Sequence, residues 1–400
     1  MAWIKKRTRN GKTTYRVGYR PHPRTKEIVV GEFQRKRDAQ KEKVRIEAAM
    51  AKGEGIDPRA DKIRLGEWLD EWMATVVKAQ AQTGRLSPTT VVGYESHVRV
   101  HLKPKLGSVP LRKLTVARVE KFLSDLQADG STAGTAMRIR ATLSKALSDA
   151  MRDELVHRNV AQIARPPKVD KRQPSAFTPP EFERIVAAAE NDRLGTLFVL
   201  AALTGMRASE LRGLRWTDVD LDEGWYEIHR GLHRISRQAA GIVAETGLVE
   251  ANPKTEGSRR RVPLSEAAVA VLREHRKRQA RERLASRTGW PETDRVFTTS
   301  VGTRLEPSNV RRSWRALLRR AAVPYNAADG HGRGLHELRR TFATRLRDAG
   351  IPLEDVQRLG RWASPQVLLA SYAATPEARL RAAANAAAAE LRPSSDPNGG

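Results

Sequence analysis

Two segments with the composition of linkers divide this chain of 400 residues, and this division constrains the fold more than any single motif does. Gly53 to Asp61 is rich in glycine, and Arg165 to Ser175 combines prolines with basic residues. Because one hydrophobic core rarely organises a chain of this length, we expect several domains. We place them at residues 1–58, 62–165 and 175–389, with a disordered tail at 390–400.

The balance of charges is strongly positive. Lys and Arg number 73 against 46 Asp and Glu, a net charge of +27, and the acidic residues are spread along the whole chain. A folded protein with this surplus attracts polyanions and releases their counterions when it binds them. Nucleic acid is therefore the expected partner. An anionic membrane surface is a weaker alternative, because no long helix pairs an apolar stripe with a basic face.

Composition also excludes several classes of protein. Hydrophobic residues make up 40% of the chain, which suffices for real cores, so we do not expect a disordered protein. No apolar run approaches the ~18 residues of a membrane span, and the basic start lacks the apolar stretch of a signal peptide. The absence of cysteine excludes disulfides and thiolate metal sites. A cytoplasmic location follows as the default expectation.

The first part of the chain is predicted to be a small basic module. Asn10-Gly11 is a hairpin-turn signal, and the alternation from Thr14 to Arg20 indicates a strand with one aromatic and one basic face. A third strand is expected at Glu27 to Phe33 and a helix at Arg35 to Lys52. Residues 1–60 carry 17 basic and 7 acidic residues. We favour a sheet that lays its basic face into a DNA groove over an ordinary solvated sheet.

The second part is predicted to be all-helical. A buried stripe begins it, Ser87-Pro88 has the form of a helix start, and two longer helices are expected at 116–126 and 135–155. His97 and His101 have the spacing of a zinc-binding helix but lack an adjacent catalytic glutamate, so a plain helix surface is expected there. The residues of the first stripe are Leu65, Trp68, Leu69 and Trp72.

The third part mixes helices with a strand-rich stretch from Trp225 to Leu264. Within it, Gly205 is suited to cap an apolar helix, and Arg207 lies at the junction with the next helix. Glu210, three residues further on, shares a face with Arg207 and can orient its guanidinium. Taken alone, this pair is as consistent with a capping ion pair as with a binding site.

Three further segments carry side chains suited to chemistry. Glu256-Gly257 supplies a turn and Val262 to Leu264 resembles a returning strand, so Lys254 is expected near the tip of a hairpin. His336 and Arg339 are three apart, next to a buried stripe expected to include Leu335, Leu338, Phe342 and Ala349. Tyr372 is the only tyrosine after that helix, in a segment of helical character. None of these segments is decisive by itself.

Taken in this order, the segments resemble the boxes of the tyrosine recombinases of the phage integrase family. Residues 204–211 resemble the first arginine box, 253–264 the lysine hairpin and 335–344, closely, the His-x-x-Arg box. The resemblance extends from residue 62 to about residue 380, and the boxes are specific only together. The amino-terminal module resembles the arm-binding domain of integrases that contact two classes of DNA site.

This resemblance implies an α+β protein. It would have a small arm-binding domain of a sheet plus a helix and an all-α, SAM-like core-binding domain. The third, catalytic domain would be mixed and mainly helical, with a small antiparallel sheet.

The resemblance also implies a role for each residue. Arg207 and Arg339 would grip the non-bridging oxygens of the scissile phosphate, and Lys254 would give a proton to the departing 5′ oxygen. His336 would hydrogen-bond the phosphate or help to take the proton of Tyr372. Tyrosine ionises near pH ~10, so it needs this cationic surrounding to attack at neutral pH. No metal or other cofactor is expected, because the arginines do the electrostatic work.

The sequence departs from the family at one position. The family usually has Leu-Gly-His before the nucleophile, with His or sometimes Trp completing the pocket. Here the chain has Leu359-Gly360-Arg361-Trp362, and the spacing to Tyr372 is slightly longer than usual. We place Trp362 in the His/Trp role, where its indole N–H can donate to the phosphate, and Arg361 is the alternative.

The expected function is therefore site-specific recombination that integrates or excises a phage or mobile element. A resolvase or chromosome-dimer recombinase is an alternative, against which the amino-terminal module argues. A metal-dependent transposase or nuclease would need a carboxylate cluster, and a non-catalytic regulator would not need the complete set of pocket residues. The resemblance implies double-stranded DNA with core-type and arm-type sites as partner, a homotetramer in the synapse and accessory proteins that bend DNA or set direction. Ala373 to Ala389 is either a segment donated to a neighbouring protomer or an intramolecular cap.

Overall fold

The structure of the protein, a computed structural model, divides into two compact units. One comprises residues 1–170 with 236–246, and the other comprises residues 171–235 with 247–400, and each is described by itself. The residues that the structure describes are 2–9, 12–19, 27–51, 63–168, 176–239, 241–243, 247–251, 260–286, 289–291, 293–327, 330–369 and 381.

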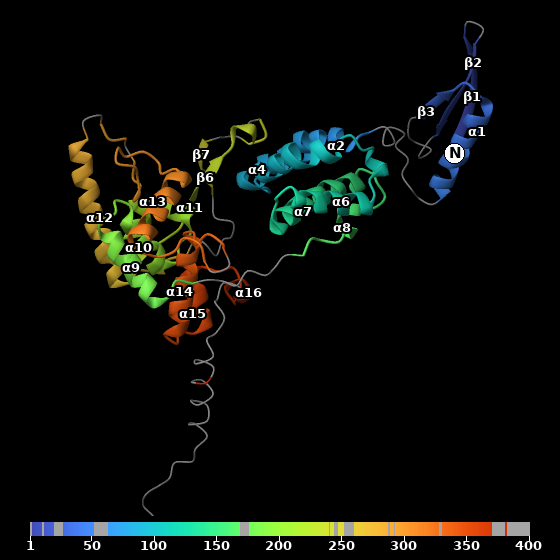
Figure 1. Cartoon of the computed structure of the whole chain (residues 1–400). Coiled ribbons are helices and arrows are strands. Elements are labelled where there is room, and N and C mark those ends of the chain that lie inside the picture. The colour runs from blue at the N-terminus through green and yellow to red at the C-terminus, as the bar shows by residue number, and fades with distance from the viewer. Residues whose placement is uncertain are drawn as a thin grey trace, which may run out of the picture. The chain divides into compact units, whose positions relative to one another are not determined.

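The first unit begins with a three-stranded antiparallel sheet and one helix (Figure 1). Tyr15, Val17 and Tyr19 lie on the face that packs against the helix, as the alternation predicts. On the other face Lys5 of the first strand is paired in register with Arg16 of the second, so basic side chains lie together there. The elements are β1 (Ala2–Arg9), β2 (Lys12–Tyr19), β3 (Ile28–Phe33) and α1 (Lys36–Ala51).

The rest of the first unit is helical, as expected. Trp68 and Trp72 are buried, and their indole N–H groups donate to the Ala146 carbonyl at 3.1 Å and to Asp149 at 2.8 Å. Ser87 caps its helix by accepting from the Thr90 N–H. The elements are α2 (Leu65–Trp72), η1 (Met73–Val77), α3 (Lys78–Gln82), α4 (Pro88–Ser96), η2 (His97–Leu102), α5 (Lys103–Leu106), η3 (Leu111–Lys113), α6 (Val116–Ala128), α7 (Ala133–Arg152), α8 (Val160–Ile163) and η5 (Arg237–Ala239).

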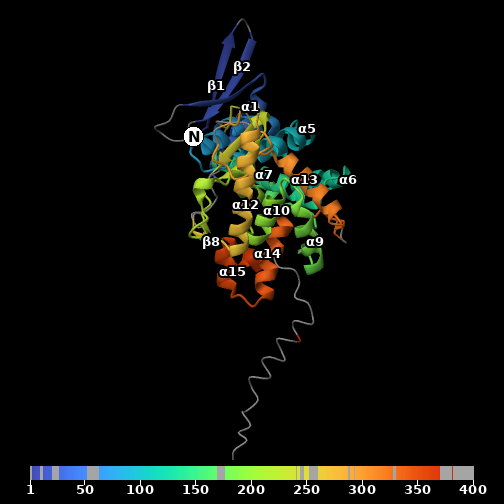
Figure 2. The same cartoon turned by 90° about the vertical axis from the view of Figure 1, so that its left-hand side faces the viewer.

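Helices form most of the second unit and enclose its core. Figure 2 shows α10 beside α12 and α14, and Trp314 of α13 lies in the core with its ring 5.2 Å from that of Phe198. The helices are α9 (Pro179–Glu190), α10 (Gly195–Thr204), α11 (Ala208–Gly213), η4 (Trp216–Asp218), α12 (Glu266–Ala285), α13 (Pro307–Arg320), α14 (His336–Asp348), α15 (Leu353–Gly360) and α16 (Pro365–Leu369).

Two small antiparallel sheets complete the second unit. One has the order β4-β5-β8, and the other is a hairpin of β6 and β7. The α+β fold expected from the sequence is therefore confirmed, with two small sheets in place of one. The strands are β4 (Val219–Asp220), β5 (Trp225–Tyr226), β6 (Gly231–Ile235), β7 (Gly247–Ala251) and β8 (Val262–Pro263).

Two local expectations are wrong. The segment at Val262 does not return along the strand that precedes Lys254, because β7 pairs with β6 and β8 pairs with β5 in the other sheet. Ala349 is not part of the buried stripe of α14, because it is the exposed residue at which the helix ends. Among the described helices, none has the length and apolar character that spanning a membrane requires.

The buried His275 predicts how the stability of the second unit depends on pH. Burial lowers the pKa of His275 to about 4, and its Nε2 lies 2.7 Å from the Val296 carbonyl oxygen. The unfolded chain takes up this proton near pH ~6.5, which the folded chain resists. The free energy of unfolding should therefore fall as the pH is lowered from ~6.5 towards ~4, by up to about 3 kcal/mol from this residue.

Urea denaturation of the full chain at several pH values measures this slope. His275→Gln should flatten it, because the titrating group is gone. His331→Gln is the control, since the His331 ring is exposed, and it should keep the slope. An unchanged slope in His275→Gln would contradict the assignment.

Candidate active site

The site is built around the turn that joins α10 to α11. Gly205 ends α10 in the left-handed region at φ 63°, and a Cβ at this position would lie 2.7 Å from the Phe342 ring. A larger residue would thus be strained by both its backbone and its neighbour. The turn brings Arg207 to the start of α11, as the sequence predicts.

Glu210 holds Arg207 in place. The Arg207 backbone N–H donates to Glu210 Oε2 at 2.9 Å, and its Nη1 donates to Oε1 at 2.8 Å. Burial would raise the pKa of Glu210, but the charges of Arg361 and Arg207 outweigh burial and hold it below its usual value. Glu210 is therefore a carboxylate at neutral pH, and 44% of the Arg207 side chain remains exposed.

Arg339 lies almost completely buried beside this turn. Its Nη1 donates to the Gly205 carbonyl, while its Nη2 has no hydrogen-bond partner among the residues that the structure describes. Its guanidinium lies 4.0 Å from the ring centre of Trp362, a cation–π contact. Burial, and then the charge of Arg207, lower the pKa of Arg339 to about 9, so it is still protonated at neutral pH.

His336 is the first residue of α14, one turn before Arg339, and it is exposed. Surrounding protein atoms, and then the charges of Arg340, Arg339 and Arg207, lower its pKa. At neutral pH the ring is therefore neutral, and it can donate from one nitrogen and accept at the other. His336 therefore lies near Arg207 and Arg339, the two predicted phosphate ligands.

Gly360 is the last residue of α15, and Arg361 and Trp362 form the turn that follows it. Arg361 has φ 57°, in the left-handed region that non-glycine residues rarely adopt. A Cβ at Gly360 would lie 1.5 Å from a Trp362 ring carbon, so only glycine leaves room for this ring. Trp362 is buried under Arg339. Arg361 and Trp362, the two alternatives for the last pocket position, therefore both lie in the cluster but contact different residues.

Arg361 is directed to the interior. Only 1% of its side chain is exposed, and its Nη2 donates to Glu210 Oε2 at 2.9 Å. Its guanidinium lies 5.4 Å from the ring centre of Tyr226, which is fully buried. Sequence reasoning missed Tyr226 and Gly360. For Tyr226, the sequence signal was the adjacent pair Trp225-Tyr226 in a predicted strand. Neighbouring residues of a strand point to opposite faces, so one of the two rings is expected to face the interior.

The structure brings together Arg207, His336, Arg339 and Trp362, four of the predicted site residues. Lys254 and Tyr372 lie outside the described residues, in the segments 252–259 and 370–380. The predicted site is therefore described in part.

The described cluster suits an anion. Among the described residues of the cluster, Arg207, Arg339 and Arg361 bring three positive charges, and Glu210 is the carboxylate that pairs with two of them. The buried Nη2 of Arg339 has no partner among the described residues. An oxyanion would supply both the missing charge and the missing acceptors. In the part of the chain that is described, no group of three or more metal-ligating side chains lies together.

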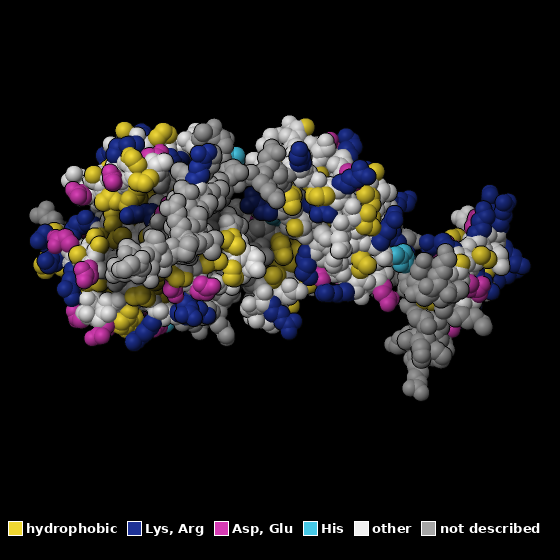
Figure 3. Space-filling model, turned by 90° about the horizontal axis from the view of Figure 1, so that it is seen from below, with side chains coloured by type: hydrophobic (Ala, Val, Ile, Leu, Met, Phe, Trp, Pro, Cys, Tyr) yellow, Lys and Arg dark blue, Asp and Glu magenta, His cyan; other side chains and the backbone are white. Residues whose placement is uncertain are grey.

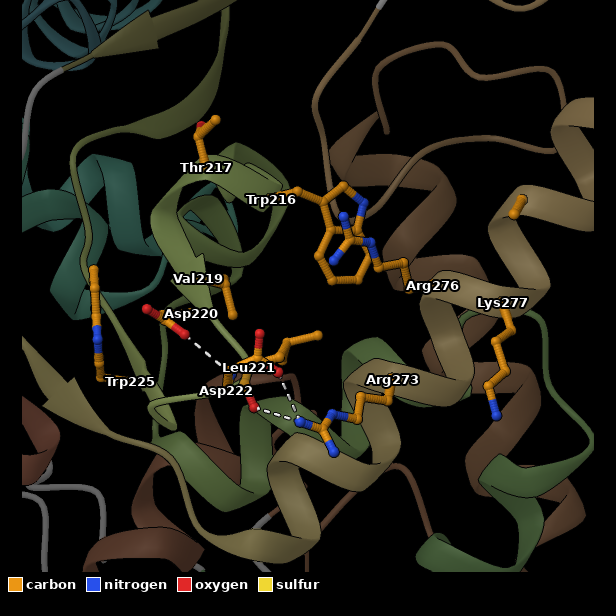
Figure 4. A pocket seen from close by; sticks show the side chains of 11 residues that line it. Trp216, Thr217, Val219, Asp220, Leu221, Asp222, Trp225, Arg273, Arg276 and Lys277 are labelled. Atoms are coloured by element: carbon orange, nitrogen blue, oxygen red, sulfur yellow. Dashed lines mark hydrogen bonds and ion pairs between the residues drawn. The ribbon is translucent and has the colours of Figure 1, made fainter.

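A hollow of about 660 Å³ lies between α12 and the β4–β5 turn (Figure 4). Arg276 lies over the Trp216 ring, and Arg273 pairs with Asp222 at 3.0 Å. Trp225, which lines this hollow, precedes Tyr226 in β5, so the two side chains point to opposite faces of the sheet. The hollow therefore lies on the other side of the β4-β5-β8 sheet from Arg361.

Comparison with known proteins places two segments of the chain. Residues 176–379 match the Phage integrase family, and residues 64–127 match the phage integrase N-terminal SAM-like domain. The chain is 27% identical over 367 residues to the tyrosine recombinase XerC-like protein of Caldanaerobacter subterraneus, a match that covers 88% of this chain and 90% of the relative.

Solved structures show the same fold. The Tn1549 transposon integrase in complex with a circular intermediate DNA superposes with a TM-score of 0.64 at 18% identity, covering 81% of this chain and 99% of that one. The lambda integrase tetramer bound to a Holliday junction gives a TM-score of 0.56 at 21% identity, covering 93% and 94%.

The packing of Gly360 against Trp362 can be tested by Gly360→Ala. The added methyl group would have to displace the ring on which Arg339 lies, so we expect a loss of about 1–3 kcal/mol of stability, the usual cost of overpacking. Thermal denaturation followed by tryptophan fluorescence measures this loss. Gly334→Ala is the matched control, because a Cβ there would meet nothing within 4 Å. Equal melting temperatures for both variants would refute the packing argument.

Proposed function

Because this chain belongs to the phage integrase family and is a tyrosine recombinase that cuts and rejoins DNA at specific sites, we propose that the cluster around Arg339 binds the scissile phosphate and that Tyr372 attacks it. The reaction would integrate or excise a phage or mobile element. The domains would be an arm-binding module at residues 1–58, a core-binding domain at 62–165 and a catalytic domain at 175–389.

The observation that carries this proposal is the incompletely compensated charge of the cluster. Among the described residues, Arg207 and Arg361 share the Glu210 carboxylate, while the buried Nη2 of Arg339, the third guanidinium of the cluster, has no partner. Buried charge without a partner is costly, so a fold that keeps such a group needs a ligand for it. A phosphodiester carries one negative charge and two non-bridging oxygens, which suit the forked donors of arginine.

Each side chain then has a role. Arg207 and Arg339 bind the non-bridging oxygens, and His336, neutral at neutral pH, donates to the phosphate or takes the tyrosine proton. Trp362 supports Arg339 through its ring face, a contact of about 1–2 kcal/mol in a desolvated site. Lys254 acts as the general acid.

The chemistry balances without a cofactor. The Tyr372 oxygen forms a bond to phosphorus as the bond to the 5′ oxygen breaks, and Lys254 gives that oxygen its proton. The 3′-phosphotyrosyl link preserves the energy of the broken bond, so another DNA end can be joined without ATP. The arginines stabilise the charge that builds up on the phosphate, as a metal ion does in other enzymes.

Tyr372→Phe tests the nucleophile. The full chain is incubated in EDTA with a nicked duplex that carries its attachment core and traps the cleaved strand. The natural protein should form a covalent adduct with DNA, visible as a band of reduced mobility in a denaturing gel. Tyr372→Phe should form none, because the attacking hydroxyl is gone.

Tyr325→Phe is the matched control, because it removes a hydroxyl that lies outside the cluster. It should still form the adduct. An adduct in Tyr372→Phe, or a requirement for Mg²⁺, would contradict the mechanism.

The amino-terminal module has the features of a second DNA-binding surface. Lys and Arg side chains gather over this module in Figure 3, and Lys5 and Arg16 lie opposite each other on the sheet face away from α1. We assign it to arm-type sites, which are distinct from the core-type sites where cleavage occurs. A basic sheet of this size can enter a groove of the duplex.

Deletion of residues 1–58 tests this assignment. The shortened chain should lose high-affinity binding to arm-site DNA in a mobility-shift assay, because the basic face is gone. Its cleavage of core-site DNA should remain within about threefold of the full chain, since the catalytic cluster lies elsewhere. Loss of core cleavage with retained arm binding would contradict the division of labour.

The assembly expected for recombination is a homotetramer, the state in which lambda integrase is bound to a Holliday junction. Accessory proteins that bend DNA or set direction are further expected partners. A resolvase or chromosome-dimer recombinase would use the same chemistry, and the relative named tyrosine recombinase XerC-like matches 88% of this chain. The arm-site deletion separates the two, because only an integrase depends on the module.

A further inference from the structure

Glu210 is shared between two arginines from distant parts of the chain. Its Oε1 accepts from Nη1 of Arg207 at 2.8 Å, and its Oε2 accepts from Nη2 of Arg361 at 2.9 Å. Of the Arg207 side chain 44% is exposed, against 1% of the Arg361 side chain. One carboxylate therefore connects an arginine that a ligand can reach with one that it cannot reach.

The backbone commits Arg361 to this internal contact. The left-handed turn at φ 57° sends the side chains of Arg361 and Trp362 to different partners, the first to Glu210 and the second to Arg339. A residue with a side chain rarely adopts this conformation unless its surroundings require it. Within the described residues, Glu210 is the one carboxylate that pairs with Arg361.

This pairing changes the charge that Arg207 presents. If Glu210 had Arg207 as its sole partner, the two charges would cancel, and the pair would offer little attraction to an anion. With Arg361 on its other oxygen, the carboxylate is already neutralised, and the triad of Arg207, Glu210 and Arg361 keeps one net positive charge. The site is partly buried, so these interactions are screened less than in water.

We propose that Arg361 is a positioning residue for DNA cleavage, which neutralises Glu210 so that Glu210 can orient Arg207 without cancelling its charge. This inference rests on the proposed function, in which Arg207 binds the scissile phosphate. It gives the departure from the usual histidine a purpose: Arg361 acts through Glu210 and does not touch the DNA.

The effect should appear in the rate of cleavage more than in the affinity for DNA. Many contacts with the DNA backbone contribute to affinity, and one charge at the site changes their sum little. During attack by tyrosine, negative charge accumulates on the non-bridging oxygens, so the transition state depends more on Arg207 than the bound substrate does.

The experiment measures single-turnover cleavage of a nicked duplex carrying the attachment core, with the full chain in saturating amount, and DNA affinity by fluorescence anisotropy. Arg361→Gln should cleave about tenfold more slowly or worse, with an affinity within about threefold of the natural protein. Arg361→Lys should retain most of the rate, because it keeps the positive charge.

The double variant Glu210→Gln with Arg361→Gln separates charge from structure. It removes both charges of the Glu210–Arg361 pair, so no carboxylate cancels the positive charge of Arg207. The double variant should therefore cleave faster than Arg361→Gln alone. A purely structural role predicts that the double variant is no faster than the single one. That result, or the natural rate in Arg361→Gln, would overturn the inference.

Two controls make each outcome decisive. Arg276→Gln removes one positive charge in the hollow on the other side of the sheet and should leave the rate unchanged. Thermal denaturation reports whether Arg361→Gln folds. If Arg361→Gln does not fold, the cleavage rate of the double variant is compared with that of Arg361→Lys. A double variant that cleaves tenfold more slowly than Arg361→Lys would overturn the inference.

Arg207→Gln separates this inference from the proposed function. If Arg207→Gln cleaves at the natural rate, the proposed phosphate site is wrong. If Arg207→Gln is inactive while Arg361→Gln is fully active, only the role of Arg361 is wrong.

Discussion

The contacts of the buried Arg339 guanidinium are the interactions on which the arrangement of the described cluster depends. Its hydrogen bond to the Gly205 carbonyl connects residues 134 positions apart, and its stacking on Trp362 adds the turn after α15. Phe342, one turn further along α14, packs on the same glycine. The turn before α11, the start of α14 and the end of α15 are thus fixed to one another through a single side chain.

Such an arrangement is costly for folding. Taking a guanidinium out of water has a penalty of several kcal/mol, and a hydrogen bond with a cation–π contact offsets only part of it. The lowered pKa of Arg339, about 9, reflects the same imbalance. A chain selected for stability alone would have an apolar residue here. A bound anion would offset the remaining deficit, so under the proposed function stability and phosphate binding are opposed at Arg339.

The sequence predicts the parts of this site that depend on local spacing. Gly205 as a helix end, the Arg207–Glu210 pair and the shared face of His336 and Arg339 follow from helix geometry within a few residues. The pairing of β8 with β5 does not follow, because strand partners are chosen by contacts across the fold. The same holds for Tyr226, whose place under Arg361 depends on which face of the sheet covers the cluster.

The choice between Arg361 and Trp362 shows why a pocket position cannot be interpreted one residue at a time. Two adjacent residues are alternatives for one role in the sequence, and the left-handed turn at Arg361 gives each a separate partner. An arginine is tolerated at this buried position because Glu210 is within reach, and Glu210 is tolerated beside Arg207 because a second cation neutralises it. The identity of each residue is therefore set by the charge of the whole cluster.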